Sequence, residues 1–380
     1  MISCKSNRKG IAFPLVEYRR KANRNLTRLW TKSGFNPVGR SMALLRIEVF
    51  VETLSRTHEP AFIIRHDNDR ILGVHMTATG KGLLEVLPLL GLFDSDHDYS
   101  EKPYAFLDAC WMTENVTGID LSLVWRSPHA LILNFAHELN WLVDKLRMSC
   151  RQDWYIRAVS DRRYESGVRA KRIQKYLGSL LYNHSKLLLV RVEFGYPVIM
   201  RNMLTIDRVY EDLREFLALI GWHPLFKHLV GYIWVVEEGG RKGPHIHLHL
   251  TFSGAHVRQD VALGGMVCDF WEQRITCGVG VSRNCNAFKH RYVQVGIGMV
   301  ERANRDACEW AVYFATYLAK DPHRPNAKDP QYLRMKPAGV DSFGTGEANI
   351  NESHVGRPPT HSIPWVPSDM LGIRWPDREQ

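Results

Sequence analysis

The chain has 380 residues, of which 45% are apolar and 24% charged, so it has the composition of a globular protein with room for two or three domains. No apolar run reaches transmembrane length, and the basic N-terminus lacks the apolar core of a signal peptide, so we expect no membrane partner. The seven cysteines are scattered without a C-x-x-C pair, so we expect reduced thiols and a cytoplasmic location. The net charge of +10 is compatible with a polyanionic partner such as nucleic acid.

The N-terminal part is basic and carries no recognisable chemical motif. Its first forty residues hold ten lysines and arginines and one acid, Glu17, which fits either a solvated tail or an arm that contacts a DNA backbone. Residues 61–66 and 70–76 predict a hairpin, and the apolar stripe of 128–148 predicts a helix. The basic stretch 151–175 is read as a linker or a helix. We therefore predict an accessory region over residues 1–175.

Residues 176–340 are predicted to form a second domain with the order β-α-β-β-α-β-α. This order is typical of the split βαβ, ferredoxin-like arrangement, an α+β fold in which helices back an antiparallel sheet. The expected strands are 186–194, 229–238, 245–252 and a segment near 292–297, and the expected helices are 205–220, 259–274 and 306–320. The Pro-rich remainder, 341–380, is predicted to be a loosely structured tail.

Three histidines, His245, His247 and His249, alternate with aliphatic residues in the third expected strand. Side chains alternate across a strand, so all three imidazoles would lie on one face. The preceding strand ends in Glu237 and Glu238, and two imidazoles with one carboxylate would bind a divalent ion while leaving positions open for substrate. Either Glu237 or Glu238 can supply the carboxylate, and His249 would join the site or lie just outside it. The competing interpretation is a row of histidines without a metal.

The last expected helix carries Tyr313, Tyr317 and Lys320 on one stripe, at spacings of four and three residues. A neighbouring ammonium group or metal ion would favour the phenolate, which is the nucleophilic form of tyrosine. The alternative is an aromatic face packed on the sheet, because Trp310 and Phe314 share this helix.

In combination, the two motifs resemble the HUH endonuclease superfamily. Within it, the chain is similar to the gene II-like replication initiators of filamentous phages (inoviruses). The resemblance covers residues 186–334, under half of the chain. It rests on Lys186–Glu193, Gly231–Glu237, Gly243–His247, Phe270–Trp271, Ile275–Gly280, Asn284–Asn286, Gly296–Gly298 and Tyr317–Lys320.

The resemblance implies nicking and joining of single-stranded DNA at a replication origin. His245 and His247, with Glu237, would hold Mg²⁺ or Mn²⁺ against the scissile phosphate, and Tyr317 would form a 5′-phosphotyrosine link. Tyr313 would be a second nucleophile if the chain follows the two-tyrosine members. Lys320 would lower the phenol pKa or contact phosphate.

The same resemblance implies which partners the chain meets. Four basic residues would contact DNA: Arg191, Arg241, Lys242 and Lys320. A host polymerase would extend the released 3′-OH in the bacterial cytoplasm, and a host helicase would open the duplex, because the chain has no P-loop. The alternatives are a relaxase or transposase of the same superfamily, or a non-catalytic ferredoxin-like module that binds nucleic acid, although no RNP1-like pattern is present.

Overall fold

A computed structural model describes residues 40–347, apart from gaps at 68–69, 94–95, 118–127, 201–203, 240–242 and 320–332. Within this range the chain forms two compact units, one ending at Val159 but including Arg334–Val340, the other comprising the rest. The division falls after Val159, inside helix α6 (Asp153–Asn183), and not at the predicted boundary after residue 175. The basic stretch 151–175, predicted to be a linker or a helix, lies in this helix from Asp153 onward. Among the described residues, no helix combines the length and apolar character needed to cross a bilayer.

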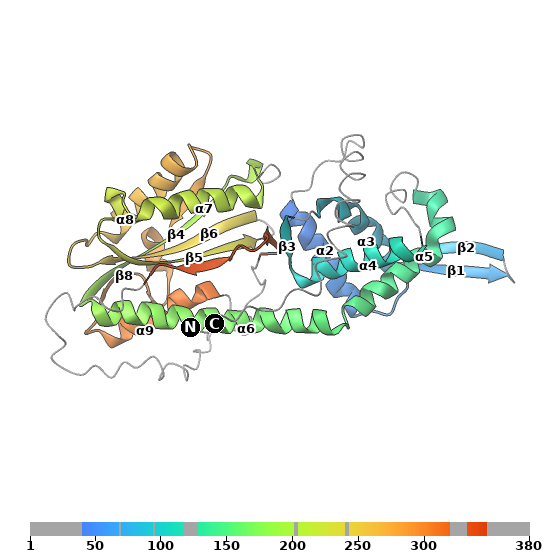
Figure 1. The fold of residues 1–380 in the computed structure, drawn as a ribbon, viewed down its shortest axis with the longest axis horizontal. Helices are drawn as coiled ribbons and strands as arrows, with labels where there is room; N and C mark the ends of the chain where they lie inside the picture. The colour runs from blue at the N-terminus through green and yellow to red at the C-terminus, as the bar shows by residue number, and fades with distance from the viewer. Residues whose placement is uncertain are drawn as a thin grey trace. The chain divides into compact units, whose positions relative to one another are not determined.

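The first unit is mainly helical, with two small antiparallel sheets (Figure 1). The predicted hairpin is confirmed as β1 paired with β2, and the predicted helix as α5. The apolar stripe of α5 is buried from Ala136 to Leu146, which explains why this segment is helical. The elements of this unit are α2 (Arg40–Ser55), β1 (Phe62–Asp67), β2 (Arg70–Met76), α3 (Ala78–Val86), η1 (Leu87–Leu92), β3 (His97–Tyr99), α4 (Glu101–Thr117), α5 (Pro128–Ser149) and β9 (Met335–Pro337).

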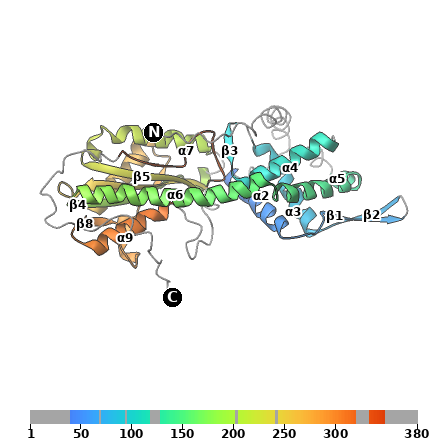
Figure 2. The same ribbon diagram turned by 60° about the horizontal axis from the view of Figure 1, so that its bottom comes forward.

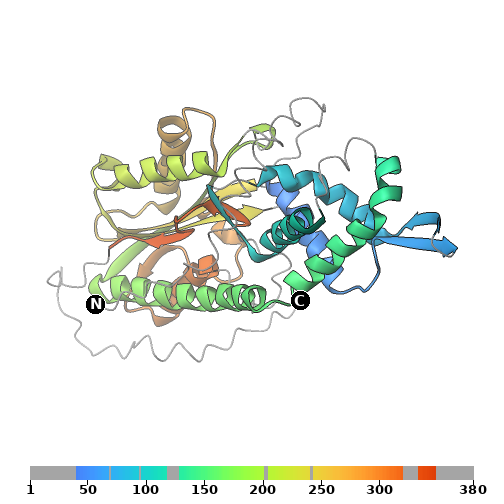
Figure 3. The same cartoon turned by 45° about the vertical axis from the view of Figure 1, so that its right-hand side comes forward.

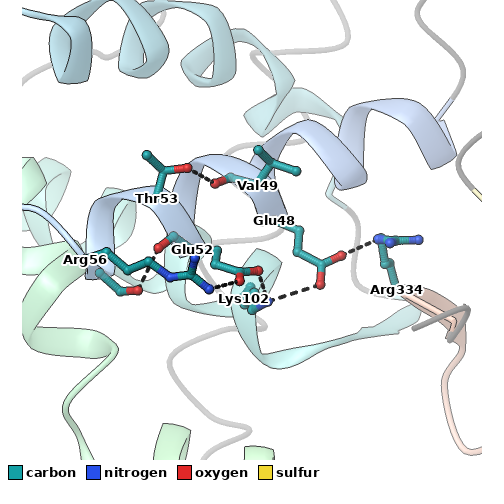
Figure 4. A network of polar contacts seen from close by, with 8 residues as sticks. Glu48, Val49, Glu52, Thr53, Arg56, Lys102 and Arg334 are labelled. Carbon is teal, nitrogen blue, oxygen red and sulfur yellow. Dashed lines mark hydrogen bonds and ion pairs between the residues drawn. The ribbon is translucent and has the colours of Figure 1, made fainter. Parts of the chain in front are cut away.

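A buried ion-pair network ties the late segment Arg334–Val340 into the first unit (Figure 4). Glu48 of α2 pairs with Arg334, and Lys102 of α4 lies 3.3 Å from Glu48 and 2.8 Å from Glu52. The carbonyl of Arg334 accepts a hydrogen bond from the amide of Ser100, next to the β3–β9 pairing. These contacts explain why residues 334–340, predicted to belong to the second domain, belong to the first unit.

The second unit is an α+β structure built on a sheet with the strand order β10-β5-β6-β4-β7, in which β8 also pairs with β4. Its strands pair in the antiparallel sense throughout the described residues. Its strands are β4 (Lys186–Gly195), β5 (Leu229–Gly239), β6 (Gly243–Ser253), β7 (Val281–Asn284), β8 (Gly298–Glu301) and β10 (Phe343–Thr345). The predicted strands 186–194, 229–238 and 245–252 are confirmed as β4, β5 and β6, to within two residues at each end.

Helices cover both faces of this sheet (Figures 1 and 2). On one face lie α7 (Ile206–Ile220), which begins after the predicted N-cap Thr205, and α8 (Asp260–Asp269), which continues as a π-helix to Ile275. On the other face, α6 and α9 (Arg305–Thr316) form an apolar core with the strands. Helix α9 ends at Thr316, earlier than expected, and a 3₁₀ turn follows over Tyr317–Ala319.

Two sequence predictions about this sheet are wrong. The strand expected near 292–297 is absent from that described segment, and β7 and β8 form on either side of it. They pair with successive parts of β4, so the chain between them leaves the ladder. Part of the predicted tail is ordered as β10, which pairs with the edge of β5 (Figure 3).

Removing the buried charge of Glu48 should destabilise the first unit. Because Arg334 is almost fully buried, we expect Glu48→Gln to cost about 3–5 kcal/mol of unfolding free energy, as is typical when one partner of a buried pair is lost. Glu52→Gln is the matched control, and this half-exposed carboxylate should cost less than about 1 kcal/mol. Urea unfolding followed by hydrogen exchange in α2 and α4 measures the unfolding free energy of both variants. Equal losses of stability in the two variants would contradict the assignment of Glu48 as the buried partner of Arg334.

Candidate metal centre

Strand β6 presents its three histidines to one face of the sheet, as the alternation predicts. In the ladder Glu237 of β5 lies opposite His245, and Arg191 of β4 lies opposite His249. Residues that face each other across antiparallel strands project to the same side. Because β6 is buried from Gly243 to Phe252, these polar side chains lie inside the second unit and not on its surface.

Glu237, His245 and His247 form a compact group whose candidate ligand atoms all lie within 4.8 Å of one another. The Oε2 atom of Glu237 lies 3.0 Å from Nε2 of His247 and 3.7 Å from Nε2 of His245. The Nδ1 atom of His245 lies 2.9 Å from the carbonyl of Gly243, which can only accept a hydrogen bond. In the neutral ring Nδ1 therefore carries the proton, and the Nε2 lone pair faces Glu237.

A second carboxylate supports His247 from the other side. Glu193 of β4 lies opposite His247 in the ladder, and its Oε1 is 3.5 Å from Nδ1 of that ring. Carboxylates next to the far nitrogen of a metal-binding imidazole orient the ring and raise its basicity. Glu193 is not among the ligands predicted from the sequence, although its position two residues after Arg191 on a buried strand marks the same face.

The donor set fits a divalent cation. Two imidazole nitrogens and one carboxylate oxygen, nearly excluded from water, are the ligands that first-row divalent metals accept, and they leave coordination positions for substrate. Burying a carboxylate costs free energy unless it is paired, and a cation would offset that cost. The arrangement therefore fits a metal site, while Mg²⁺ or Mn²⁺ as its occupant stays a prediction.

The two alternative third ligands are not in this group. Glu238 lies opposite Pro244 and projects to the other face of the sheet from Glu237. His249 is fully buried opposite Arg191, and burial, together with the Arg191 charge, lowers its pKa to about 3. His249 is therefore neutral at physiological pH.

Arg191 connects the face that carries the histidines with the end of α9. Its guanidinium lies over the rings of Phe314, at 4.9 Å, and Tyr317, at 5.6 Å, while the side chain is buried. Tyr317 itself is 46% exposed. Tyr317 therefore contacts a buried guanidinium group with one part of its ring while about half of the residue is open to solvent.

The other predicted site residues differ in what the structure says of them. The ring of Tyr313 packs edge-on against Trp310, at 5.5 Å. Because the α-helix ends at Thr316, Tyr317 lies in the 3₁₀ turn that follows and not on the α-helix with Tyr313. Lys320, Arg241 and Lys242, the remaining predicted DNA contacts, lie outside the described residues.

Loss of a ligand should weaken metal binding without disturbing the fold elsewhere. We expect Glu237→Gln and His247→Ala each to reduce Mn²⁺ affinity at least about tenfold, since ligand supports alone are worth about 10- to 100-fold. His256→Ala, an exposed histidine after the far end of β6, is the matched control and should bind as the wild type does. Isothermal titration decides this, and unchanged affinity in the ligand variants would rule out the site.

Comparison with known proteins adds no relative. No family model matches the chain, and neither a curated protein nor a solved structure is significantly similar to it. The functional interpretation therefore rests on the residues of the site and on the resemblance of the sequence motifs.

Proposed function

We propose that the chain is a metal-dependent endonuclease and strand transferase that nicks and rejoins single-stranded DNA through a 5′-phosphotyrosine intermediate. The observation that carries this proposal is the position of Arg191. It lies in the ladder opposite His249, two residues along β6 from His247, and its guanidinium covers the ring of Tyr317. A candidate metal site and an accessible phenol thus share one face of the sheet.

The topology of the second unit supports the same proposal. Strands β4 and β5 are joined through α7 and run in the same direction, with β6 inserted between them in the opposite direction. Strands β7 and β8 then pair with the free side of β4. This is the order expected for a split βαβ, ferredoxin-like sheet, which the HUH resemblance implies.

The chemistry follows from the positions of the groups. A divalent ion bound by Glu237, His245 and His247 would neutralise charge on the scissile phosphate. The phenol oxygen of Tyr317 loses its proton as it forms a bond to phosphorus, the bond from phosphorus to the 3′ oxygen breaks, and that oxygen takes up a proton and leaves as a 3′-OH. The guanidinium of Arg191 lies over the tyrosine ring and would hold it beside the metal ligands.

Joining is the reverse reaction. A 3′-OH attacks the phosphotyrosine, the phosphodiester is restored, and the phenol is released. Because the covalent link keeps the energy of the phosphodiester, closure needs no nucleotide cofactor. We assign this cycle to the initiation and termination of rolling-circle replication of a phage or related mobile element in the bacterial cytoplasm. A host polymerase would extend the 3′-OH, and a separate helicase would unwind the duplex.

Replacing the nucleophile should abolish the covalent product. We expect Tyr317→Phe to form no protein–DNA adduct with Mn²⁺ and a pool of labelled single strands, because the variant lacks only the phenol oxygen. Binding of the same strands should be nearly unchanged. A denaturing gel separates adduct from free DNA and gives the yield.

Tyr313→Phe is the matched control, since it removes the same atom one helical turn earlier. It should still form the first adduct. A full yield from Tyr317→Phe would move the nucleophile to another tyrosine. Strand binding without any adduct in the wild type would favour the non-catalytic alternative.

A further inference from the structure

Beside the metal centre, two arginines lie over one phenylalanine ring. The guanidinium of Arg283, on β7, lies 5.4 Å from the centre of the Phe288 ring, and that of Arg291 lies 4.9 Å from it. Both arginines are exposed, and Phe288 is half-buried in the 3₁₀ turn η6 (Asn286–Arg291). We call these three residues the β7 platform.

The two arginines of the platform are exposed and form no ion pair with the described residues. No described carboxylate lies within ion-pair distance of Arg283 or Arg291. Lys289 in the same turn differs, because its Nζ lies 2.7 Å from Asp260. Two like charges held on one ring repel each other, and an anion bound between them would relieve that repulsion. The platform therefore offers a binding position for negative charge.

The ladder places the platform next to the candidate metal centre. Arg283 lies opposite Glu193, and Glu193 is the carboxylate 3.5 Å from His247. Arg283 and Glu193 thus share the sheet face that carries the metal ligands. Because neighbouring strands are about 4.8 Å apart, β7 lies roughly 10 Å from β6. A DNA strand with one phosphate at the metal centre would reach the platform with its neighbouring phosphates.

Hydrogen bonds to β4 fix the turn that carries Phe288 and Arg291. The side chain of Asn286 accepts from the amide of Arg191 at 2.8 Å and donates to the carbonyl of Leu189 at 2.9 Å, in the gap between the β7 and β8 pairings. It also donates to Asp260. The platform is therefore attached to the same strand that positions Arg191, so its geometry relative to the metal centre is set before DNA binds.

We propose that the β7 platform binds the single-stranded DNA that flanks the cleaved phosphate. Arg283 and Arg291 contact phosphates or stack on bases, and Phe288 holds the two guanidinium planes in place. Positive charge interleaved with an aromatic ring is the usual surface for single strands. This inference rests on the proposed function for the identity of its ligand, and it adds contacts that the sequence motifs do not contain.

The test measures DNA binding apart from cleavage. All proteins carry Tyr317→Phe and are kept in EDTA, and the probe is a fluorescein-labelled single strand of mixed sequence followed by anisotropy over a series of NaCl concentrations. We expect Arg283→Gln with Arg291→Gln to weaken binding about tenfold at low salt. The slope of log Kd against log salt should fall by roughly 1.4, or about 0.7 for each phosphate that the variant no longer neutralises.

The matched control is Arg258→Gln with Arg274→Gln, which removes the same charge elsewhere. Arg258 is exposed beyond the far end of β6, and Arg274 faces Glu215 of α7 on the other side of the sheet. The control should keep the wild-type slope. The variant Arg283→Lys with Arg291→Lys, which keeps both positive charges, should also show the wild-type slope that the glutamine variant loses. An unchanged slope in the glutamine variant, an equal loss in the control, or failure of the lysine variant to restore the slope would overturn the proposal.

The outcome is separable from that of the proposed function. If the wild type forms no adduct with Mn²⁺ while the platform variant still loses its salt slope, the nicking reaction is wrong and the platform stands. If the adduct forms and the platform variant binds as the wild type does, the platform alone is wrong, and its charges serve a partner other than DNA.

Discussion

Burial of charged and titratable groups on the central strand is the constraint on which the second unit depends. Strand β6 is covered on both faces, so its imidazoles and the adjacent carboxylate of Glu237 have almost no access to water. Such groups cost free energy unless they pair with one another or bind a cation. The Oε2 atom of Glu237 lies 3.0 Å from Nε2 of His247 and 3.7 Å from Nε2 of His245. The groups that can offset one another's cost of burial therefore lie together at one point of the sheet.

A second buried charge extends this constraint to the helix. Arg191 is almost fully covered, and the contacts that compensate it include the faces of Phe314 and Tyr317. The backbone of Arg191 is held in turn by Asn286 through the gap in the ladder. One strand, β4, therefore sets the position of the tyrosine, of the supporting carboxylate Glu193 and of the turn that carries the β7 platform. This is how residues from distant parts of the sequence come to lie near one another.

The sequence was informative where a local pattern has a single physical cause. Alternation along β6 predicted that its histidines share a face, and the apolar periodicity of α7, with its N-cap Thr205, predicted that helix. Parity indicated that only one of the adjacent residues Glu237 and Glu238 can face the histidines, but the preference for Glu237 came from the resemblance, and the ladder places Glu237 opposite His245.

What the sequence could not supply depends on contacts between distant residues. Residues 334–340 were assigned to the second domain because no local pattern reveals that Arg334 pairs with Glu48, 286 positions earlier. Strands β7, β8 and β10 have three or four residues each, too few for a periodic signal, and they form because β4 and β5 offer unpaired edges. The stacking of Arg191 on Tyr317 likewise depends on how α9 packs on the sheet.

The most direct test of the account is the identity of the residue that carries DNA. After reaction with Mn²⁺ and single-stranded DNA, nuclease and trypsin digestion would leave a nucleotide on a peptide for mass spectrometry. Cleavage after Arg305 and Lys320 yields Asp306–Lys320, which contains both tyrosines of the helix motif, and fragmentation distinguishes them. The account predicts the nucleotide on Tyr317. A nucleotide on a tyrosine outside this peptide, such as Tyr292, would contradict it.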